Sequence, residues 1–142
     1  MADPQRVSPH EAKELLDQGW TYLDVRTPAE WAAGHPPGAP NVPWAFSGAA
    51  GMTPNPDFVS QVEKLYGKDA KLVLGCRSGG RSLKAAQALL GAGFTSVIDQ
   101  RAGWEGPRDS FGKVTEKGWS LEGLPSETTT PGQSWDELKA KV

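Results

Sequence analysis

The apolar residues of this chain fall into short blocks, and the blocks alternate between the spacing of strands and the spacing of helices. Residues 71–75 carry three apolar side chains in succession, which is typical of a strand buried on both faces. The β-rich segments 21–25 and 96–99 predict two more strands. Residues 41–43 predict only a brief strand, because Pro43 cannot donate to a ladder of hydrogen bonds.

Helices are predicted between these strands. Ser8 and Thr27 each precede a proline and stand three residues before a glutamate, which is the pattern of a capped helix start. The segment that follows the Cys76 loop has its apolar side chains on one helical face. The five expected helices span residues 8–18, 27–34, 55–66, 81–90 and 134–141.

Strands that alternate with helices predict an α/β fold, with an open, mainly parallel central sheet flanked by helices on both faces. Residues 44–53 are rich in Gly and Ala, residues 103–133 are rich in Gly, Pro, Ser and Thr, and both are interpreted as loops. A length of 142 residues fits one domain with a single core. We expect a catalytic part over residues 1–106 and a C-terminal extension over 107–142, consisting of a loop and a short helix packed on the same domain.

The composition argues against several classes of protein. A net charge of -2 gives no reason to expect nucleic acid or an anionic membrane as a partner. No apolar run approaches the ~18–20 residues that span a bilayer, and the first residues lack the apolar core of a secretory signal. His10 and His35 are too distant from each other and from the one cysteine to predict a metal site, and no cofactor is expected.

Cys76 is the one cysteine, so an internal disulfide and an internal pair of redox thiols are excluded. A lone thiol fits a reducing compartment, and we expect a cytoplasmic location. A lone cysteine is more often a small buried hydrophobic residue than a nucleophile. The surroundings of Cys76 favour the nucleophile, because it follows a predicted parallel strand at the edge where open α/β sheets bind their ligands.

The six-residue loop that begins with this cysteine has the composition of an anion-binding turn. Ser78, Gly79 and Gly80 have little or no side chain, so successive backbone amides can converge on the sulfur at the start of the next helix. Such a field favours the thiolate, which is the nucleophilic form of cysteine. Arg77 and Arg81 add positive charge that suits a small oxyanion such as thiosulfate.

Several further motifs lie in order over residues 7–104. They are Leu23-Asp24-Val25-Arg26, Glu30-Trp31, Gly34-His35, Pro37-Gly38-Ala39, Asn41-Val42-Pro43, the Cys76 loop and Gly93-Phe94. In order and spacing they resemble the single-domain rhodaneses, a family of sulfurtransferases with a thiosulfate sulfurtransferase-like activity. Together the motifs are highly specific, whereas any one of them alone is weak.

The resemblance implies a role for Cys76 as nucleophile and sulfur carrier. In this family the cysteine attacks the outer sulfur of a donor, typically thiosulfate, and sulfite leaves. The persulfide then passes its sulfur to cyanide, to a thiol or to a sulfur-carrier protein. The resemblance also implies a cradle for the persulfide and the substrate anion, formed by Arg77, Ser78, Gly79, Gly80, Arg81 and Ser82.

The length of the Cys76 loop separates a sulfurtransferase from a phosphatase or arsenate reductase. Phosphatases and arsenate reductases of related fold have an arginine six positions after the cysteine, whereas here that position is Ser82 and the arginine, Arg81, is the fifth. The shorter loop suits one sulfur atom better than a phosphoryl group, and an oxyanion phosphatase or arsenate reductase becomes a distant alternative. A persulfide relay or binding module for one protein partner stays open, as does the choice between monomer and homodimer.

Other residues are candidates for supporting the site. Asp24 and Arg26 can be read as a catalytic acid and an anion clamp or as a structural brace, and the resemblance favours the brace, as it does for His35. Trp44 follows a segment that borders the active-site entrance in the family, although core packing explains it equally well. The chain departs from the family's Gly-Gly turn at residues 100–104, which makes Arg101 a candidate for an additional anion contact.

Overall fold

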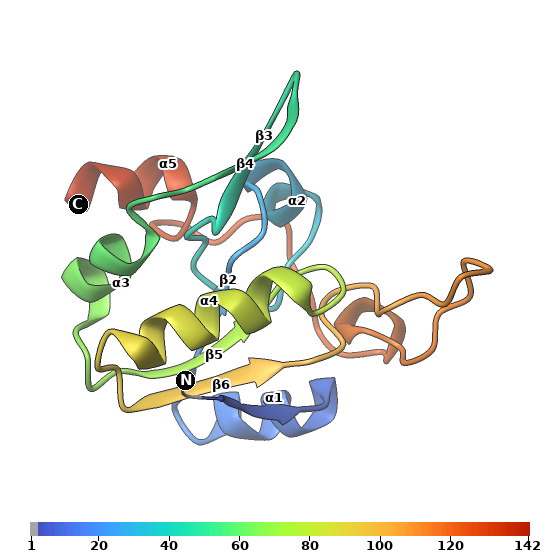
Figure 1. Ribbon diagram of the computed structural model, residues 1–142. Coiled ribbons are helices and arrows are strands. Elements are labelled where there is room, and N and C mark those ends of the chain that lie inside the picture. The colour runs from blue at the N-terminus through green and yellow to red at the C-terminus, as the bar shows by residue number, and fades with distance from the viewer. Residues whose placement is uncertain (1–2) are drawn as a thin grey trace.

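The computed structural model describes residues 3–142, and its central element is a parallel β-sheet (Figure 1). The sheet has the strand order β1-β6-β5-β2, and every neighbouring pair is parallel. Its strands are β1 (Gln5–Val7), β2 (Thr21–Asp24), β5 (Lys71–Gly75) and β6 (Ser96–Gln100). Because the strands are parallel, their carboxyl ends meet at one edge of the sheet, and Cys76 lies there directly after β5.

Helices cover both faces of this sheet, which confirms the predicted fold class (Figure 1). The helices are α1 (Pro9–Asp17), α2 (Pro28–Ala33), α3 (Phe58–Tyr66), α4 (Gly80–Gly91) and α5 (Trp135–Leu138). Leu72 and Leu74 of β5 pack against α3 and α4 on one face, whereas Val73 packs with Ala12 of α1 on the other. β5 is therefore buried on both faces, as its run of apolar residues predicts.

The first two helices begin as the sequence predicts. The side chain of Ser8 accepts a hydrogen bond from the amide of Glu11, and the side chain of Glu11 accepts one from the amide of Ser8. Thr27 and Glu30 form the same reciprocal pair at the start of α2. The second capping box fixes the point at which the chain, after leaving β2, turns into α2 at the carboxyl edge of the sheet.

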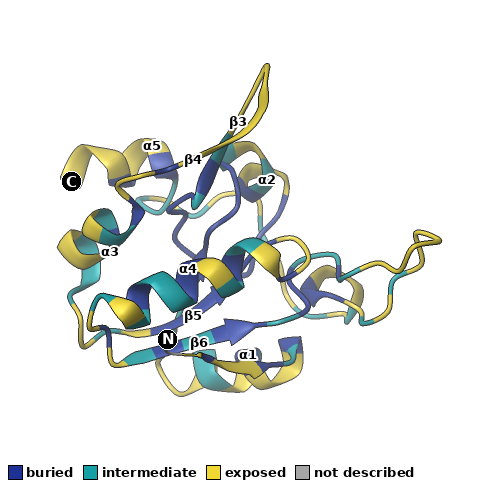
Figure 2. Cartoon of the chain, viewed as in Figure 1, coloured by how far each residue is buried: buried dark blue, intermediate teal, exposed yellow. Residues whose placement is uncertain are grey.

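Several segments differ from the prediction. Residues 41–43, expected as a brief strand, form only an isolated bridge between Asn41 and Asp24. Residues 44–53, expected as a loop, contain most of an antiparallel hairpin of β3 (Ala45–Gly48) and β4 (Gly51–Pro54), which projects from the body of the molecule and is largely exposed (Figures 1 and 2). Its Gly and Ala content conceals the strands, because neither residue favours a strand. The short edge strand β1 was also missed, since it contains one buried residue and no alternating pattern.

Residues 107–142 have little regular structure, as expected. Residues 107–116 form an extended turn that leaves the body and exposes Phe111, and a 3-10 turn follows at Trp119–Leu121 (Figures 1 and 2). The predicted closing helix is short: α5 gives way to a 3-10 turn at Lys139–Lys141. Trp135 and Leu138 of α5 are buried in the same core cluster as α3. Within residues 3–142, no helix has both the length and the apolar character needed to cross a membrane.

Candidate active site

Cys76 lies at the carboxyl edge of the sheet with only 2% of its surface exposed. Its Sγ accepts a hydrogen bond from the backbone amide of Gly79 at 3.1 Å and lies 3.4 Å from Oγ of Ser82. Gly79 has a left-handed backbone with φ of 102°, which turns its amide back toward the sulfur. α4 begins at the next residue, so the sulfur faces a helix N-terminus, where negative charge is stabilised.

Residues 103–105, which follow β6, hold the cysteine loop through backbone hydrogen bonds. The amide of Trp104 donates to the carbonyl of Cys76 at 2.7 Å, and the amide of Glu105 donates to the carbonyl of Arg77 at 3.0 Å. Gly103 permits this close approach, because a Cβ there would lie 2.5 Å from the carbonyl carbon of Arg77. The cysteine loop is therefore fixed by backbone contacts as well as by its connection to β5 and α4.

A buried carboxylate lies behind the loop, next to Ser82. Nε of Arg6 donates to Oδ2 of Asp99 at 2.8 Å, and Nη2 of Arg6 lies 3.3 Å from the carbonyl oxygen of Gly79. Burial raises the pKa of Asp99, although the hydrogen bond and the charge of Arg6 oppose that rise. Sequence reasoning missed both residues. The signal was the position of Asp99 near the end of β6, at the same edge as Cys76, with Arg6 as its register partner in β1.

The two arginines of the cysteine loop are matched with carboxylates. Arg81 donates two hydrogen bonds to Glu30, at 2.8 and 3.0 Å, and Nε of Arg77 donates to Glu105 at 2.7 Å. Burial alone would raise the pKa of Glu30, but hydrogen bonds from Arg81 and from the Thr27 backbone outweigh it and lower the pKa to about 2. The positive charge expected from Arg77 and Arg81 is thus balanced by two acidic residues that were not predicted as part of the site.

Asp24 and Arg26 form a buried ion pair. Nη2 of Arg26 lies 2.6 Å from Oδ2 of Asp24 and 2.6 Å from the carbonyl oxygen of Gly34, and the guanidinium lies 5.0 Å from the ring centre of Trp104. The contact with Gly34 ties the end of α2 to the end of β2. Each side chain therefore has partners within the protein, and the role of this pair as a brace stays a prediction.

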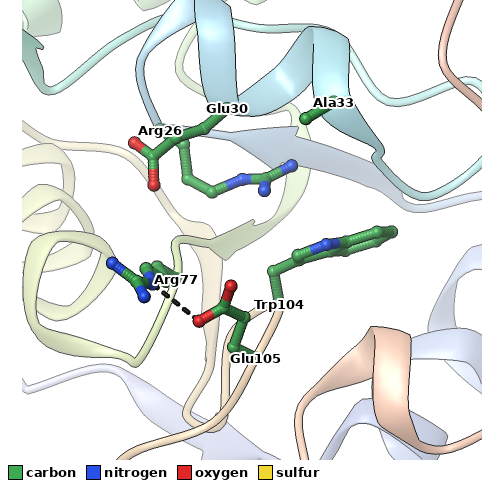
Figure 3. A pocket seen from close by; sticks show the side chains of 6 residues that line it. All are labelled: Arg26, Glu30, Ala33, Arg77, Trp104 and Glu105. Atoms are coloured by element: carbon green, nitrogen blue, oxygen red, sulfur yellow. Dashed lines mark hydrogen bonds and ion pairs between the residues drawn. The ribbon is translucent and has the colours of Figure 1, made fainter.

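A cavity of about 270 Å³ opens beside the cysteine loop (Figure 3). In Figure 3, Arg26 and Glu30 face Arg77 and Glu105 across the open space, and Trp104 closes one side. Its walls come from the end of β2, from α2, from the cysteine loop and from the segment after β6. The lining residues are Arg26, Glu30, Ala33, Arg77, Trp104 and Glu105.

Trp44 and Arg101 are the other residues that the sequence predicts to border the site. Trp44 packs edge-to-face on Phe58 and also lines a second cavity, of about 360 Å³, that borders Gly80 and Arg81. Arg101 points elsewhere, because its guanidinium donates to Glu116 at 2.8 to 3.1 Å.

The fully buried His35 stacks on Trp31, with Nδ1 2.7 Å from the carbonyl oxygen of Trp31 and Nε2 2.8 Å from Oγ1 of Thr130. These contacts hold the loop after α2 against the C-terminal segment. Both ring nitrogens are therefore engaged within the protein.

Comparison with known proteins identifies the family of this chain. The Rhodanese-like domain family matches residues 8–108. Thiosulfate sulfurtransferase 16, chloroplastic, of Arabidopsis thaliana is 44% identical over 124 residues, which cover 87% of this chain and 93% of that protein. Senescence-associated protein DIN1 of Raphanus sativus is 45% identical over 101 residues, and the match covers 71% of this chain but 55% of that longer protein.

The crystal structure of Rv0390 from M. tuberculosis superposes with a TM-score of 0.75 at 29% identity, covering 90% of this chain and 100% of that one. The resemblance inferred from the sequence motifs is thereby confirmed. The chain belongs to the rhodanese-like domain family, whose members include proteins named as thiosulfate sulfurtransferases.

Proposed function

We propose that this protein is a sulfurtransferase that carries sulfane sulfur on Cys76 as a persulfide. The donor is thiosulfate or a related compound, and the acceptor is cyanide or a thiol. The observation that carries the proposal is the amide of Gly79 at 3.1 Å from Sγ of Cys76, at the N-terminus of a helix of 12 residues. This geometry favours an anionic sulfur, either the thiolate that attacks the donor or the persulfide that follows.

The proposed reaction has two half-reactions. The Cys76 thiolate attacks the outer sulfur of thiosulfate, the sulfur–sulfur bond of the donor breaks, and sulfite leaves with the bonding electron pair. The acceptor then attacks the terminal sulfur of the persulfide. With cyanide the products are thiocyanate and the restored thiolate, and no external oxidant or reductant is consumed.

Burial of Cys76 and the backbone contacts of its loop serve both half-reactions. The burial of Cys76 shields its persulfide from water. The hydroxyl of Ser82 lies near enough to contact the sulfur anion, whether it is the thiolate or the persulfide. Because backbone contacts hold the loop in this geometry, little reorganisation precedes the attack.

Mass spectrometry of the intact protein tests this proposal. After treatment with thiosulfate and removal of the excess, the wild type should gain the mass of one sulfur atom, and a reductant should remove it. Cys76→Ser should gain nothing and should produce no thiocyanate from thiosulfate and cyanide. Equal behaviour of the two proteins would rule out Cys76 as the sulfur carrier.

A relay to one protein partner is the second candidate. It is favoured by the exposed β3–β4 hairpin, whose Met52 is 52% exposed and lines the cavity beside Gly80 and Arg81. Ready labelling of Cys76 combined with negligible turnover by small acceptors would support the relay. Rapid turnover with cyanide or small thiols would favour the enzyme acting alone.

A further inference from the structure

The cavity beside the cysteine loop is lined by two guanidinium groups and two carboxylates (Figure 3). Two of these four groups are paired with residues outside the lining of the cavity: Arg26 with Asp24, and Glu30 with Arg81. The other pair, Arg77 and Glu105, forms an ion pair across 2.7 Å, which the dashed line in Figure 3 marks. The cavity therefore presents no excess of positive charge to a small anion.

Arg77 and Glu105 are the exchangeable charges of this cavity. Their side chains are 57% and 39% exposed, and an ion pair at that exposure contributes little to stability. A ligand with an ammonium group and a carboxylate can take the place of each partner and leave neither charge alone. A ligand with a single charge pairs with either Arg77 or Glu105 and leaves the other without an ionic partner.

Both residues lie next to the backbone of Cys76, although Glu105 is distant from it in the sequence. Arg77 directly follows Cys76, and Trp104, which precedes Glu105, donates its amide to the carbonyl of Cys76 at 2.7 Å. The indole of Trp104 adds an apolar wall. A volume of about 270 Å³ is at the lower limit of ligand pockets, which span roughly 300–1,000 Å³, and suits a molecule of few atoms.

We propose that this cavity binds the sulfur acceptor, and that the acceptor is a small zwitterionic thiol of the α-amino-acid type. Its ammonium group pairs with Glu105 and its carboxylate pairs with Arg77. The inference rests on the proposed function of Cys76. The acceptor thiol loses its proton to solvent, its thiolate attacks the terminal sulfur on Cys76, and the enzyme's sulfur–sulfur bond breaks. The products are the acceptor persulfide and the Cys76 thiolate.

Transfer from preloaded Cys76 persulfide to three thiols provides the kinetic test. Cysteine carries both charges, N-acetylcysteine lacks the ammonium group, and cysteamine lacks the carboxylate. These thiols differ in intrinsic reactivity, but that difference cancels when the ratio of two rate constants is compared between wild type and a variant. Glu105→Gln should lower the cysteine to N-acetylcysteine ratio about tenfold, and Arg77→Gln should lower the cysteine to cysteamine ratio similarly.

Glu63→Gln supplies the matched control, because Glu63 is an exposed glutamate on α3 that is likewise paired with a cation, Lys68. Its ratios should equal those of the wild type. If Glu105→Gln and Arg77→Gln also keep the wild-type ratios while Cys76 still takes up sulfur, the zwitterion site is wrong and the sulfurtransferase stands. If Cys76 takes up no sulfur from any donor, the proposed function itself fails.

A binding measurement gives a reading that needs no turnover. S-methylcysteine has both charges but cannot accept sulfur, and calorimetry with Cys76→Ser should show that it binds at least about tenfold more tightly than N-acetyl-S-methylcysteine. Glu105→Gln in that background should remove the preference. Equal affinity for the two compounds would overturn the inference whatever the kinetics show.

Discussion

The guanidinium of Arg81, in the first turn of α4, meets the carboxylate of Glu30 on α2 through two hydrogen bonds of 2.8 and 3.0 Å. Glu30 also accepts a hydrogen bond from the amide of Thr27 and so completes the cap of α2. One carboxylate thus joins the helix that supports the cysteine loop to the helix that forms the opposite wall of the cavity. The position of that wall therefore depends in part on one ionised group.

Stability should reflect the ionisation of Glu30. The ordinary pKa of 4.5 falls to about 2 in the folded protein, so the contribution of Glu30 is complete above pH 4.5 and is lost as the pH falls toward 2. Glu30→Gln should lower the free energy of unfolding by about 1–2 kcal/mol at neutral pH and should weaken the acid dependence. Urea unfolding across this range measures both effects.

Glu14→Gln is the control for that measurement, since Glu14 is an exposed residue of α1. It should unfold like the wild type at neutral pH. An acid dependence of Glu30→Gln as steep as that of the wild type would contradict the role given to Glu30.

The balance of charge at the cavity leads to a prediction about small anions. Removing the negative charge of Glu105 frees Arg77, so Glu105→Gln should raise kcat/KM for thiosulfate about three- to tenfold. The gain should shrink as ionic strength increases, because Arg77 is exposed. Steady-state kinetics at two salt concentrations measure it, and a fall in kcat/KM at low salt would contradict this account of the cavity.

The hydroxyl of Ser82 is predicted to assist the sulfur anion. It is fully buried and lies 3.4 Å from Sγ of Cys76. Ser82→Ala should slow alkylation of Cys76 by iodoacetamide and lower kcat for thiocyanate formation about tenfold, since one charge-assisted hydrogen bond is lost. Ser110→Ala, at an exposed position outside the site, should have no effect. Alkylation at the wild-type rate in Ser82→Ala would show that the hydroxyl only fills space.

The sequence was sufficient for the features that depend on neighbouring residues. The apolar run in β5, the capping boxes at Ser8 and Thr27, and the position of Cys76 at the carboxyl edge of the sheet all follow from local patterns. The family resemblance depended on motif order over most of the chain, and the comparisons confirmed it.

Features that depend on distant pairs could not be predicted. Glu30 and Arg81 are 51 residues apart, and Arg77 and Glu105 are 28 apart, so neither carboxylate carries a local signal that it will neutralise a loop arginine. The β3–β4 hairpin was missed for another reason: strands rich in small residues have no alternating apolar pattern, and this one buries little of its surface.

Two adjacent glycines of the loop should tolerate alanine very differently. Gly79 has a left-handed backbone, and a Cβ there would lie 2.2 Å from the carbonyl oxygen of Arg101. Gly80 begins α4, and a Cβ there would meet no atom of residues 3–142 within 4 Å beyond its own stretch of helix. Gly79→Ala should therefore cost about 2–3 kcal/mol of stability and prevent persulfide formation, whereas Gly80→Ala should change stability by less than about 1 kcal/mol. Thermal unfolding of the two variants measures the difference, and similar melting temperatures would contradict it.

Arg6 is predicted to stabilise the fold by compensating the buried charge of Asp99. Oδ2 of Asp99 accepts from Nε of Arg6 at 2.8 Å, and the carboxylate is fully buried. Burial raises the pKa of Asp99 while the hydrogen bond and the charge of Arg6 restrain that rise, so loss of Arg6 should raise the pKa further. An acid with a raised pKa in the folded state destabilises the protein as the pH increases above its ordinary value.

Arg6→Met should therefore be nearly as stable as the wild type at about pH 4 and about 2–3 kcal/mol less stable at about pH 8. Adding Asp99→Asn removes the stranded charge, so the double variant should regain part of the lost stability at the higher pH and show little dependence on pH. Urea unfolding of the three proteins at both pH values provides the measurement. A loss that is equal at the two pH values would mean that Arg6 acts through packing, with the charge of Asp99 compensated by its remaining neighbours.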